Sequence, residues 1–262
     1  MLIDTHCHLD AAEFDADRAV VHARAEDVGV GRLVIPAVAV DGFAKTRSVV
    51  AAFSGCVAAY GIHPLYAKSA SEADLDVLRA WLVREKPVAV GEIGLDFFVE
   101  NKDPARQVFF FEKQLALAGE AGLPVLLHVR RAVDAVLKSL RRWRVPGGIA
   151  HAFNGSRQQA DAFIKQGFVL GFGGAMTFEG STRIRQLATS LPLDAIVLET
   201  DAPDIPPAWL NGGRNEPAVL RRIAEVLAEL RGISVDEVMV ATTANAIRVL
   251  PRLGPRSEFD LG

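Results

Sequence analysis

The chain has 262 residues, of which 50% are hydrophobic and 23% are charged, and its formal net charge is −3. This length suits a single α/β barrel, and the composition excludes a disordered chain. The small negative charge excludes a global field that would attract nucleic acid, although a local basic patch is compatible with it.

The first residues contain no positively charged segment that leads into an apolar run. No stretch approaches the roughly 20 apolar residues that a membrane span needs. We therefore expect a cytoplasmic protein without a membrane partner. Because the chain can bury an ample core, Cys7 and Cys56 need not form a disulfide, and we expect both thiols to be reduced.

Short apolar runs rich in β-forming residues alternate with longer segments of helical periodicity. In chain order, the predicted strands are 2–8, 32–38, 56–63, 87–94, 124–129, 147–153, 168–175 and 195–201. Helical spacing is clearest at 75–85, 105–122, 132–143 and 216–232. We interpret residues 1–262 as one domain in which 251–262 form a loosely held tail.

The alternation of strands and helices predicts the fold class. Strands that are apolar on both faces and alternate with helices indicate a parallel sheet covered by helices. Eight such units favour closure into a (β/α)8 barrel, the TIM barrel. A doubly wound open sheet is the structural alternative.

Side chains that can bind metals gather at the carboxyl ends of the predicted strands. They are His6, His8, His63, Glu92, His128, His151 and Asp201. In a closed parallel barrel these ends share one rim, where barrel enzymes build their active sites, so distant residues would converge. Residues i and i+2 of a strand share a face, so we expect His6 and His8 to point together and Cys7 to point into the packing layer.

The ligand types constrain the metal. Imidazole with carboxylate suits Zn, Mn, Fe or Co better than Mg or Ca. Four imidazoles and two carboxylates are too many for one tetrahedral ion that keeps an open position. Two ions bridged by a carboxylate fit the count, and such a pair can hold a phosphoryl group and generate hydroxide near neutral pH. We predict two divalent ions per chain, with Zn, Mn, Co and Mg as the candidates.

A set of motifs stands in a characteristic order: IDTHCHLD (3–10), GIHP (61–64), VGEIGLDF (90–97), LPVLLHVRRA (123–132), HAFNGS (151–156), LETDAP (198–203), RNEP (214–217) and TTANA (242–246). Together they resemble the TatD family of metal-dependent hydrolases, in the amidohydrolase superfamily. The resemblance spans nearly the whole chain, although HxH alone recurs across the superfamily. The fourth strand offers Glu92 and no lysine, which favours the TatD branch over relatives that use a carboxylated lysine.

The resemblance implies two metal ions that share Glu92. The ligands of one ion match His6, His8, Glu92 and Asp201, and those of the other match Glu92, His128 and His151. Asp201 would also orient or deprotonate the attacking water, and His63 would contact the substrate phosphate. The implied catalytic residues are therefore Asp201, Glu92 and His63.

The predicted substrate contacts are His63, Arg130 and Asn154. Asn154 stands in an Asn-Gly-Ser sequence that is equally an ordinary turn. The family commonly has an acidic residue where this chain has Arg131, which adds positive charge beside the rim. No family role passes to Arg131.

Several other polar residues have weaker signals. Glu199 and Asp4 are candidates for orienting a ligand histidine, with a structural polar role as the alternative. The cluster of Arg141, Arg142 and Arg144 falls before the sixth strand, at the opposite rim, and we interpret it as a solvated face.

The resemblance implies a deoxyribonuclease that hydrolyses phosphodiester bonds through metal-activated water, with a single-stranded 3′ end as its candidate substrate. The alternative is a carboxylic ester or amide hydrolase on the same site, such as a D-aminoacyl-tRNA deacylase, because the same hydroxide attacks a carbonyl. A third interpretation is a metal-binding partner protein without catalysis. DNA or another phosphodiester is the expected partner, and the sequence identifies neither a protein partner nor an oligomeric state.

Overall fold

The computed structural model describes residues 1–100 and 103–253. In these residues eight strands form one parallel sheet in sequence order. The strands are β1 (Leu2–Asp4), β2 (Val30–Pro36), β3 (Cys56–Tyr60), β4 (Ala89–Asp96), β5 (Val125–Arg130), β6 (Gly148–Ala150), β7 (Phe168–Phe172) and β8 (Ile196–Leu198). Next to β8, the Thr5 amide that follows β1 donates to the Leu198 carbonyl at 3.1 Å. The predicted (β/α)8 barrel is therefore confirmed, and the open-sheet alternative is wrong.

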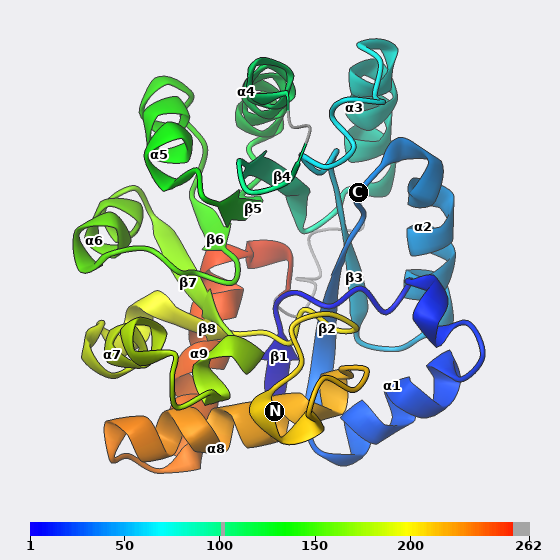
Figure 1. Ribbon diagram of the computed structural model, residues 1–262. Coiled ribbons are helices and arrows are strands. Elements are labelled where there is room, and N and C mark those ends of the chain that lie inside the picture. Colours follow the sequence, from blue (N-terminus) through cyan, green and yellow to red (C-terminus); the bar gives the residue numbers. More distant parts are fainter. Residues whose placement is uncertain (101–102, 254–262) are drawn as a thin grey trace.

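Helices α1 to α8 form a ring around the sheet, and α9 lies across one end of the barrel (Figure 1). They are α1 (Arg18–Asp27), α2 (Phe43–Ala52), α3 (Ala73–Glu85), α4 (Pro104–Ala121), α5 (Val133–Arg142), α6 (Arg157–Lys165), α7 (Thr182–Ser190), α8 (Leu220–Arg231) and α9 (Val235–Val249). Three of the predicted helices match α3, α4 and α5 closely. The fourth, predicted from residue 216, begins instead with a 3-10 turn at Pro217–Val219 that precedes α8.

The boundaries of α4 follow from its capping residues. Asp103 accepts a hydrogen bond from the Arg106 amide at 3.0 Å, and Pro104 occupies the first turn, where no amide donor is needed. Gly122 ends the helix in the left-handed conformation at φ 61°. These signals predict the same helix from the sequence alone.

The interior of the barrel is filled by one small or branched residue from each strand. These residues are Ile3, Val34, Ala59, Ala89, Leu126, Ile149, Val169 and Val197. Ala246, Val249 and Leu250, from α9 and the residue after it, pack against them. Asn245 donates to the carbonyls of Leu193 and Ile196 at the start of β8, so α9 covers the amino end of the barrel and the opposite end carries the site.

Most predicted strands extend too far toward their carboxyl ends. β1 ends at Asp4, β3 at Tyr60, β6 at Ala150 and β8 at Leu198, so the predicted site residues that follow them lie in loops. Beyond the strand ends the backbone bonds between loops: the Asp201 amide donates to the His6 carbonyl at 2.8 Å, and the His8 amide donates to the Ala202 carbonyl at 2.8 Å. The loops are thus fixed to each other by hydrogen bonds outside the regular sheet.

Two other expectations concern the ends and the surface of the chain. Pro251–Leu253 form a 3-10 turn, and the rest of the predicted loose tail lies outside the described residues. No helix in the described ranges has the length and apolar character needed to cross a membrane. The organisation of residues 1–262 as one domain stays a prediction.

Candidate metal centre

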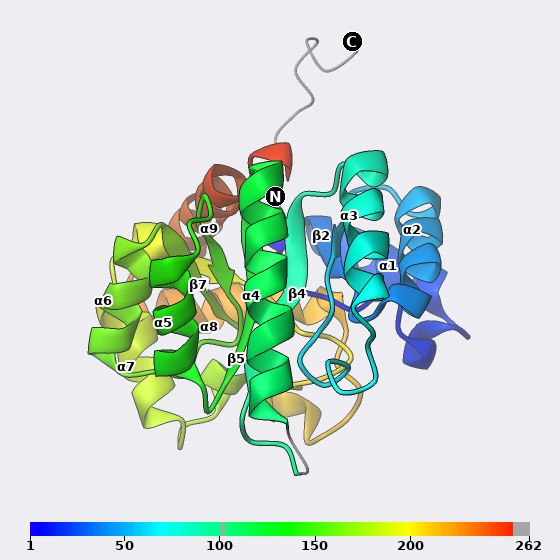
Figure 2. The same ribbon diagram turned by 90° about the horizontal axis from the view of Figure 1, so that it is seen from above.

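The predicted metal ligands lie together at the carboxyl end of the barrel, where the loops that follow the strands gather at the lower end of Figure 2. A cavity of about 1200 Å³ opens there, and its walls include His8, Glu92, His128, His151 and Asp201. His6 lies beneath this surface and is fully buried. Cys7 is also fully buried, but it packs into the hydrophobic core, as the alternation of side chains predicts.

Four of these residues form a first ligand group. The His6 Nε2 atom lies 3.3 Å from His8 Nε2, 3.3 Å from Glu92 Oε2 and 3.5 Å from Asp201 Oδ1. The His8 Nε2 atom lies 3.7 Å from each of the same two carboxylate oxygens. Ligands about 2.0–2.2 Å from a tetrahedral ion lie about 3.3–3.6 Å from one another. His6, His8 and Asp201 therefore form one compact group that could hold an ion, and Glu92 Oε2 lies within 3.7 Å of both histidines.

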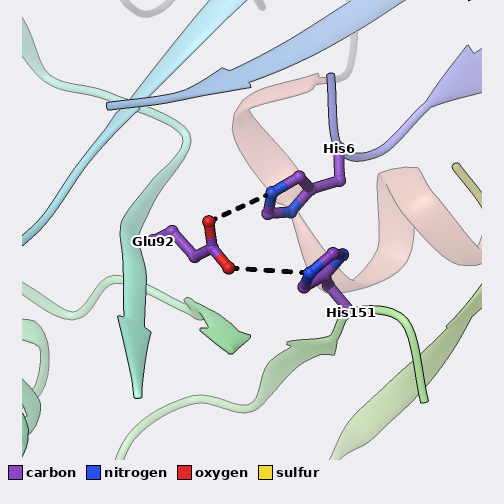
Figure 3. Close-up of side chains that lie close together, drawn as sticks. All are labelled: His6, Glu92 and His151. Atoms are coloured by element: carbon purple, nitrogen blue, oxygen red, sulfur yellow. Dashed lines mark ion pairs between the residues drawn. The ribbon is translucent and has the colours of Figure 1, made fainter. Parts of the chain in front are cut away.

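A second group surrounds the other oxygen of Glu92. Its Oε1 atom lies 3.0 Å from His128 Nδ1 and 3.6 Å from His151 Nε2. Figure 3 shows the Glu92 carboxylate between His6 and His151, with one oxygen directed toward each ring. A carboxylate whose two oxygens face separate imidazole groups has the geometry of a bridging ligand.

His63 was predicted to contact the substrate phosphate, but its ring lies directly beside the second ligand group. Its Nε2 atom is 3.6 Å from Glu92 Oε1, the same separation as for His151, and its ring centroid is 4.4 Å from that of His128. The Leu65 amide donates to Nδ1 of His63 at 3.2 Å, which leaves Nε2 facing the site. His63 therefore has the position of a substrate contact or of a further metal ligand.

Burial and neighbouring charges fix the protonation states of the group. Burial lowers the pKa of His6 and of His63 to about 3 in each case. Burial opposes the charge of Glu92, but His63 and His6 outweigh it and hold the pKa of Glu92 well below its ordinary value. Neutral imidazole and ionised carboxylate are the forms that bind metal. Burial also raises the pKa of Asp201, to about 6.

His151 is held by Glu199, as one interpretation of the sequence anticipated. Its Nδ1 atom lies 3.3 Å from Glu199 Oε1, which also accepts a hydrogen bond from the Ala152 amide at 2.5 Å. Burial opposes a charge on His151, but the carboxylates of Asp201 and Glu199 outweigh it and raise the pKa of His151 to about 10. With Nδ1 directed at Glu199, Nε2 is the atom that faces Glu92, and His151 must lose a proton before Nε2 can bind a metal ion.

Asp96 is a site residue that the sequence analysis did not single out. Its Oδ2 atom lies 3.2 Å from His128 Nε2, while Nδ1 of that ring faces Glu92. Burial opposes the charge of Asp96, but the hydrogen bond with His128 lowers its pKa. Asp96 stands four residues after Glu92 on β4, so the alternation of strand faces was a signal that would have identified it.

Gly94 allows this arrangement because it lies between Glu92 and Asp96 at the contact of β4 with β5. Its φ is 149°, and an added Cβ atom would lie 1.9 Å from the His128 carbonyl oxygen. Only glycine permits the two backbones to approach so closely.

Asp4 does not contact a ligand ring. Its carboxyl group accepts hydrogen bonds from the Thr200 amide at 3.0 Å, the Thr200 hydroxyl at 2.6 Å and the His6 amide at 3.3 Å. Burial raises the pKa of Asp4 to about 8. Asp4 thus ties the backbones that carry His6 and Asp201. Of the two roles weighed for Asp4, the structural one matches these backbone contacts.

The two other predicted substrate contacts line the cavity but already have protein partners. The Arg130 guanidinium lies 4.0 Å from the centroid of the Phe98 ring and 3.9 Å from Asp96 Oδ2. Asn154 Oδ1 accepts hydrogen bonds from Nε and Nη2 of Arg183 at 3.2 and 2.9 Å. The amide nitrogen of Asn154 is therefore the atom that could serve a substrate, and Arg183 is a cavity residue that the sequence analysis missed.

Comparisons with known proteins agree with this geometry. A family model described as "TatD related DNase" matches residues 3–251. The "Uncharacterized metal-dependent hydrolase YjjV" of Escherichia coli K12 is 39% identical over 246 residues, which are 93% of this chain and 95% of that protein. The crystal structure of YjjV, described as a TatD homolog, is similar with a TM-score of 0.92 at 37% identity and covers 95% of this chain and 98% of its own. The "3'-5' ssDNA/RNA exonuclease TatD" of Cronobacter sakazakii is 33% identical over 255 residues, which are 95% of this chain and 97% of that protein.

Proposed function

Since this chain belongs to the TatD-related family of metal-dependent hydrolases, we propose that it is a nuclease that removes nucleotides from the 3′ end of single-stranded DNA. The observation that carries the proposal is Glu92, because one of its carboxylate oxygens faces His6 and the other faces His128. Relatives named 3'-5' ssDNA/RNA exonuclease support the choice of substrate. DNA is thus the proposed partner, and a cytoplasmic location stays a prediction.

The residues have distinct proposed roles. His6, His8, Glu92 and Asp201 would hold one divalent ion, and Glu92, His128 and His151 would hold a second, with Zn, Mn, Co and Mg as candidates. When bound, such a pair supplies an activated water and neutralises charge on the phosphate. Asp201 orients that water and accepts its proton. His63 Nε2 and the Arg130 guanidinium contact the phosphate oxygens, and the Asn154 amide nitrogen donates to a further oxygen.

The charges around the cavity support a polyanionic substrate. Its walls carry four cationic side chains, Lys45, Arg130, Arg131 and Arg183, and six carboxylates, Asp10, Glu13, Glu92, Asp96, Asp201 and Asp204. Two bound divalent ions would offset the carboxylates of the ligand groups, and the cationic side chains would then attract a phosphate backbone. The cavity volume of about 1200 Å³ also exceeds what one nucleotide needs.

A carboxylic ester or amide hydrolase, such as a D-aminoacyl-tRNA deacylase, is the second candidate. The same ligand groups would support attack on a carbonyl carbon. Several relatives are named only as metal-dependent hydrolases, a description that fits this second candidate as well as the nuclease.

The test uses metal-stripped protein with Mg, Mn, Co or Zn added back singly. A single-stranded oligonucleotide labelled at its 5′ end and an aminoacyl-tRNA are supplied in separate reactions. We expect metal-dependent shortening of the oligonucleotide, which Glu92→Ala abolishes and Glu229→Ala, a change of an exposed carboxylate on α8, leaves intact. Cleavage of the aminoacyl-tRNA ester while the oligonucleotide stays intact would reject the nuclease and support the ester hydrolase.

A further inference from the structure

Phe98 is an exposed aromatic residue on the wall of the cavity. Its side chain is 52% exposed, although large apolar rings are normally buried. Its backbone is held in place, because the Phe98 amide donates to Asp96 Oδ1 at 2.8 Å. The neighbouring Phe97 packs against the hydrophobic core, so the exposure of Phe98 is not a property of the whole loop.

Two arginines lie against the Phe98 ring. The guanidinium carbon of Arg130 is 4.0 Å from the ring centroid, and that of Arg131 is 5.6 Å away. We name Phe98, Arg130 and Arg131 the aromatic platform. A stacked guanidinium stays flat and keeps its donors at its edge, where they remain available to an anion.

Arg131 adds charge that the rest of the site does not neutralise. Within the described residues, no carboxylate lies at ion-pair distance from it, whereas Lys45 pairs with Asp15 at 3.0 Å. Its backbone has a φ of 55°, a left-handed conformation that is uncommon for a residue other than glycine, and it begins the turn into α5. The side chain lines the cavity.

The platform lies directly beside the second ligand group. Asp96 connects the two, since its Oδ2 atom is 3.2 Å from His128 Nε2 and 3.9 Å from Arg130 Nη1. A nucleic acid whose phosphate reached His128 would therefore present its neighbouring nucleotide to Phe98. Base stacking on an aromatic ring combined with arginine contacts to the backbone is typical of proteins that bind single strands.

We propose that the aromatic platform binds the nucleotide next to the cleaved phosphodiester bond: its base stacks on Phe98, and Arg131 contacts its phosphate. This inference rests on the proposed nuclease function and adds a stacking contact for the nucleotide beside the cleaved bond, which requires a substrate of at least two nucleotides. In a duplex, the paired base next to the terminal pair is stacked on both faces, so contact with the ring would require the duplex end to open. Phe98 is thus a specificity-determining residue.

The first experiment measures binding rather than turnover. A fluorescein-labelled oligothymidylate is titrated with metal-loaded Asp201→Asn protein, and a second oligonucleotide has an abasic unit at the position next to the 3′ terminal nucleotide. We expect Phe98→Ala to weaken binding of the first about 5- to 150-fold. The same change should leave binding of the abasic oligonucleotide unaltered, and Phe98→Trp should retain tight binding. Phe178→Ala removes a ring that is 45% exposed and lies outside the cavity walls, and it should change neither affinity.

A second measurement tests the charge. Arg131→Asn keeps a residue that tolerates the left-handed backbone and removes the cation. We expect the slope of log affinity against log salt to become shallower by about 0.7. Arg144→Asn, at the opposite end of the barrel beside Val145, should leave the slope unchanged.

The outcomes separate this inference from the proposed function. In the Asp201→Asn background, equal affinities for each oligonucleotide with and without Phe98→Ala would overturn the platform, even if wild-type protein shortens DNA. Binding that depends on Phe98 in that background, together with no shortening of DNA by metal-loaded wild-type protein, would support the platform and refute the nuclease.

Discussion

At the scale of single residues, the site depends on a buried carboxylate. Glu92 is only 2% exposed, and imidazoles lie around both of its oxygens. An unpaired charge in such a place would be costly, so the histidines both stabilise Glu92 and prepare the ligand geometry. Asp201 has two proposed roles, as a ligand and as the acceptor of a proton, and a conservative substitution can separate them.

Asp201→Asn should retain metal and lose catalysis. The amide keeps one oxygen for the ion but cannot accept the proton of the attacking water, so we expect kcat to fall about 10²- to 10⁴-fold. Metal content is measured by mass spectrometry beside the rate on a labelled oligonucleotide. Loss of metal in parallel with activity would reduce Asp201 to a ligand, and retained activity would exclude it as the base. A loss of activity with metal retained contradicts a metal-binding protein without catalysis.

At the scale of elements, α4 holds two strand ends in place through buried glutamines. Gln114 accepts from the Ile62 amide at 2.6 Å and donates to the Ile62 carbonyl at 3.0 Å, directly before His63. Gln107 bonds in the same way to the backbone of Asp96, at 2.9 and 3.0 Å. Each glutamine thus supplies hydrogen bonds where the strand ends.

Gln114→Leu should destabilise the fold and displace His63. The change preserves size but leaves the amide and carbonyl of Ile62 without partners, at about 1–3 kcal/mol each. We expect the free energy of unfolding to fall by about 2–4 kcal/mol in urea titrations. Gln186→Leu, an exposed position on α7, is the matched control and should change it by less than about 0.5 kcal/mol. An equal change in the free energy of unfolding for both variants would show that the hydrogen bonds of Gln114 do not stabilise the fold.

Gly94→Ala should disrupt the contact of β4 with β5. The new Cβ atom would lie 1.9 Å from the His128 carbonyl oxygen, in a backbone conformation that alanine disfavours. We expect a loss of more than about 2 kcal/mol of stability, or no folded protein. Gly180→Ala, which meets nothing within 4 Å, is the control for thermal unfolding. Similar melting temperatures for both variants would refute the close approach.

At the scale of the whole molecule, one end of the barrel is structural and the other end carries the candidate site. α9 seals the amino end with apolar residues, while the loops at the carboxyl end hold the ligand groups. The ligands come from segments near both ends of the sequence, so the site exists only in the folded chain. Metal binding and folding are therefore linked.

Divalent metal should stabilise the folded protein. An ion that binds only the native state at 100 times its dissociation constant adds about 2.7 kcal/mol. We expect the melting temperature of metal-stripped protein to rise when Zn or Mn is added, and the rise to be smaller in His6→Ala. Calorimetric scans with and without each metal measure this. An identical rise in wild-type and His6→Ala protein would mean that the ion binds elsewhere.

The barrel could be predicted from the sequence, because hydrophobic periodicity reflects the neighbours of each residue, and motif order with the family resemblance predicted most of the residues that meet at the site. It did not identify Asp96, Gln114 or the exposed Phe98 as important, and it extended the strands beyond their ends. The atoms that meet, as between Glu199 and His151 or between Asp4 and Thr200, could be identified only in the folded chain. Those contacts join segments far apart in the chain, and closure of the barrel sets their distances.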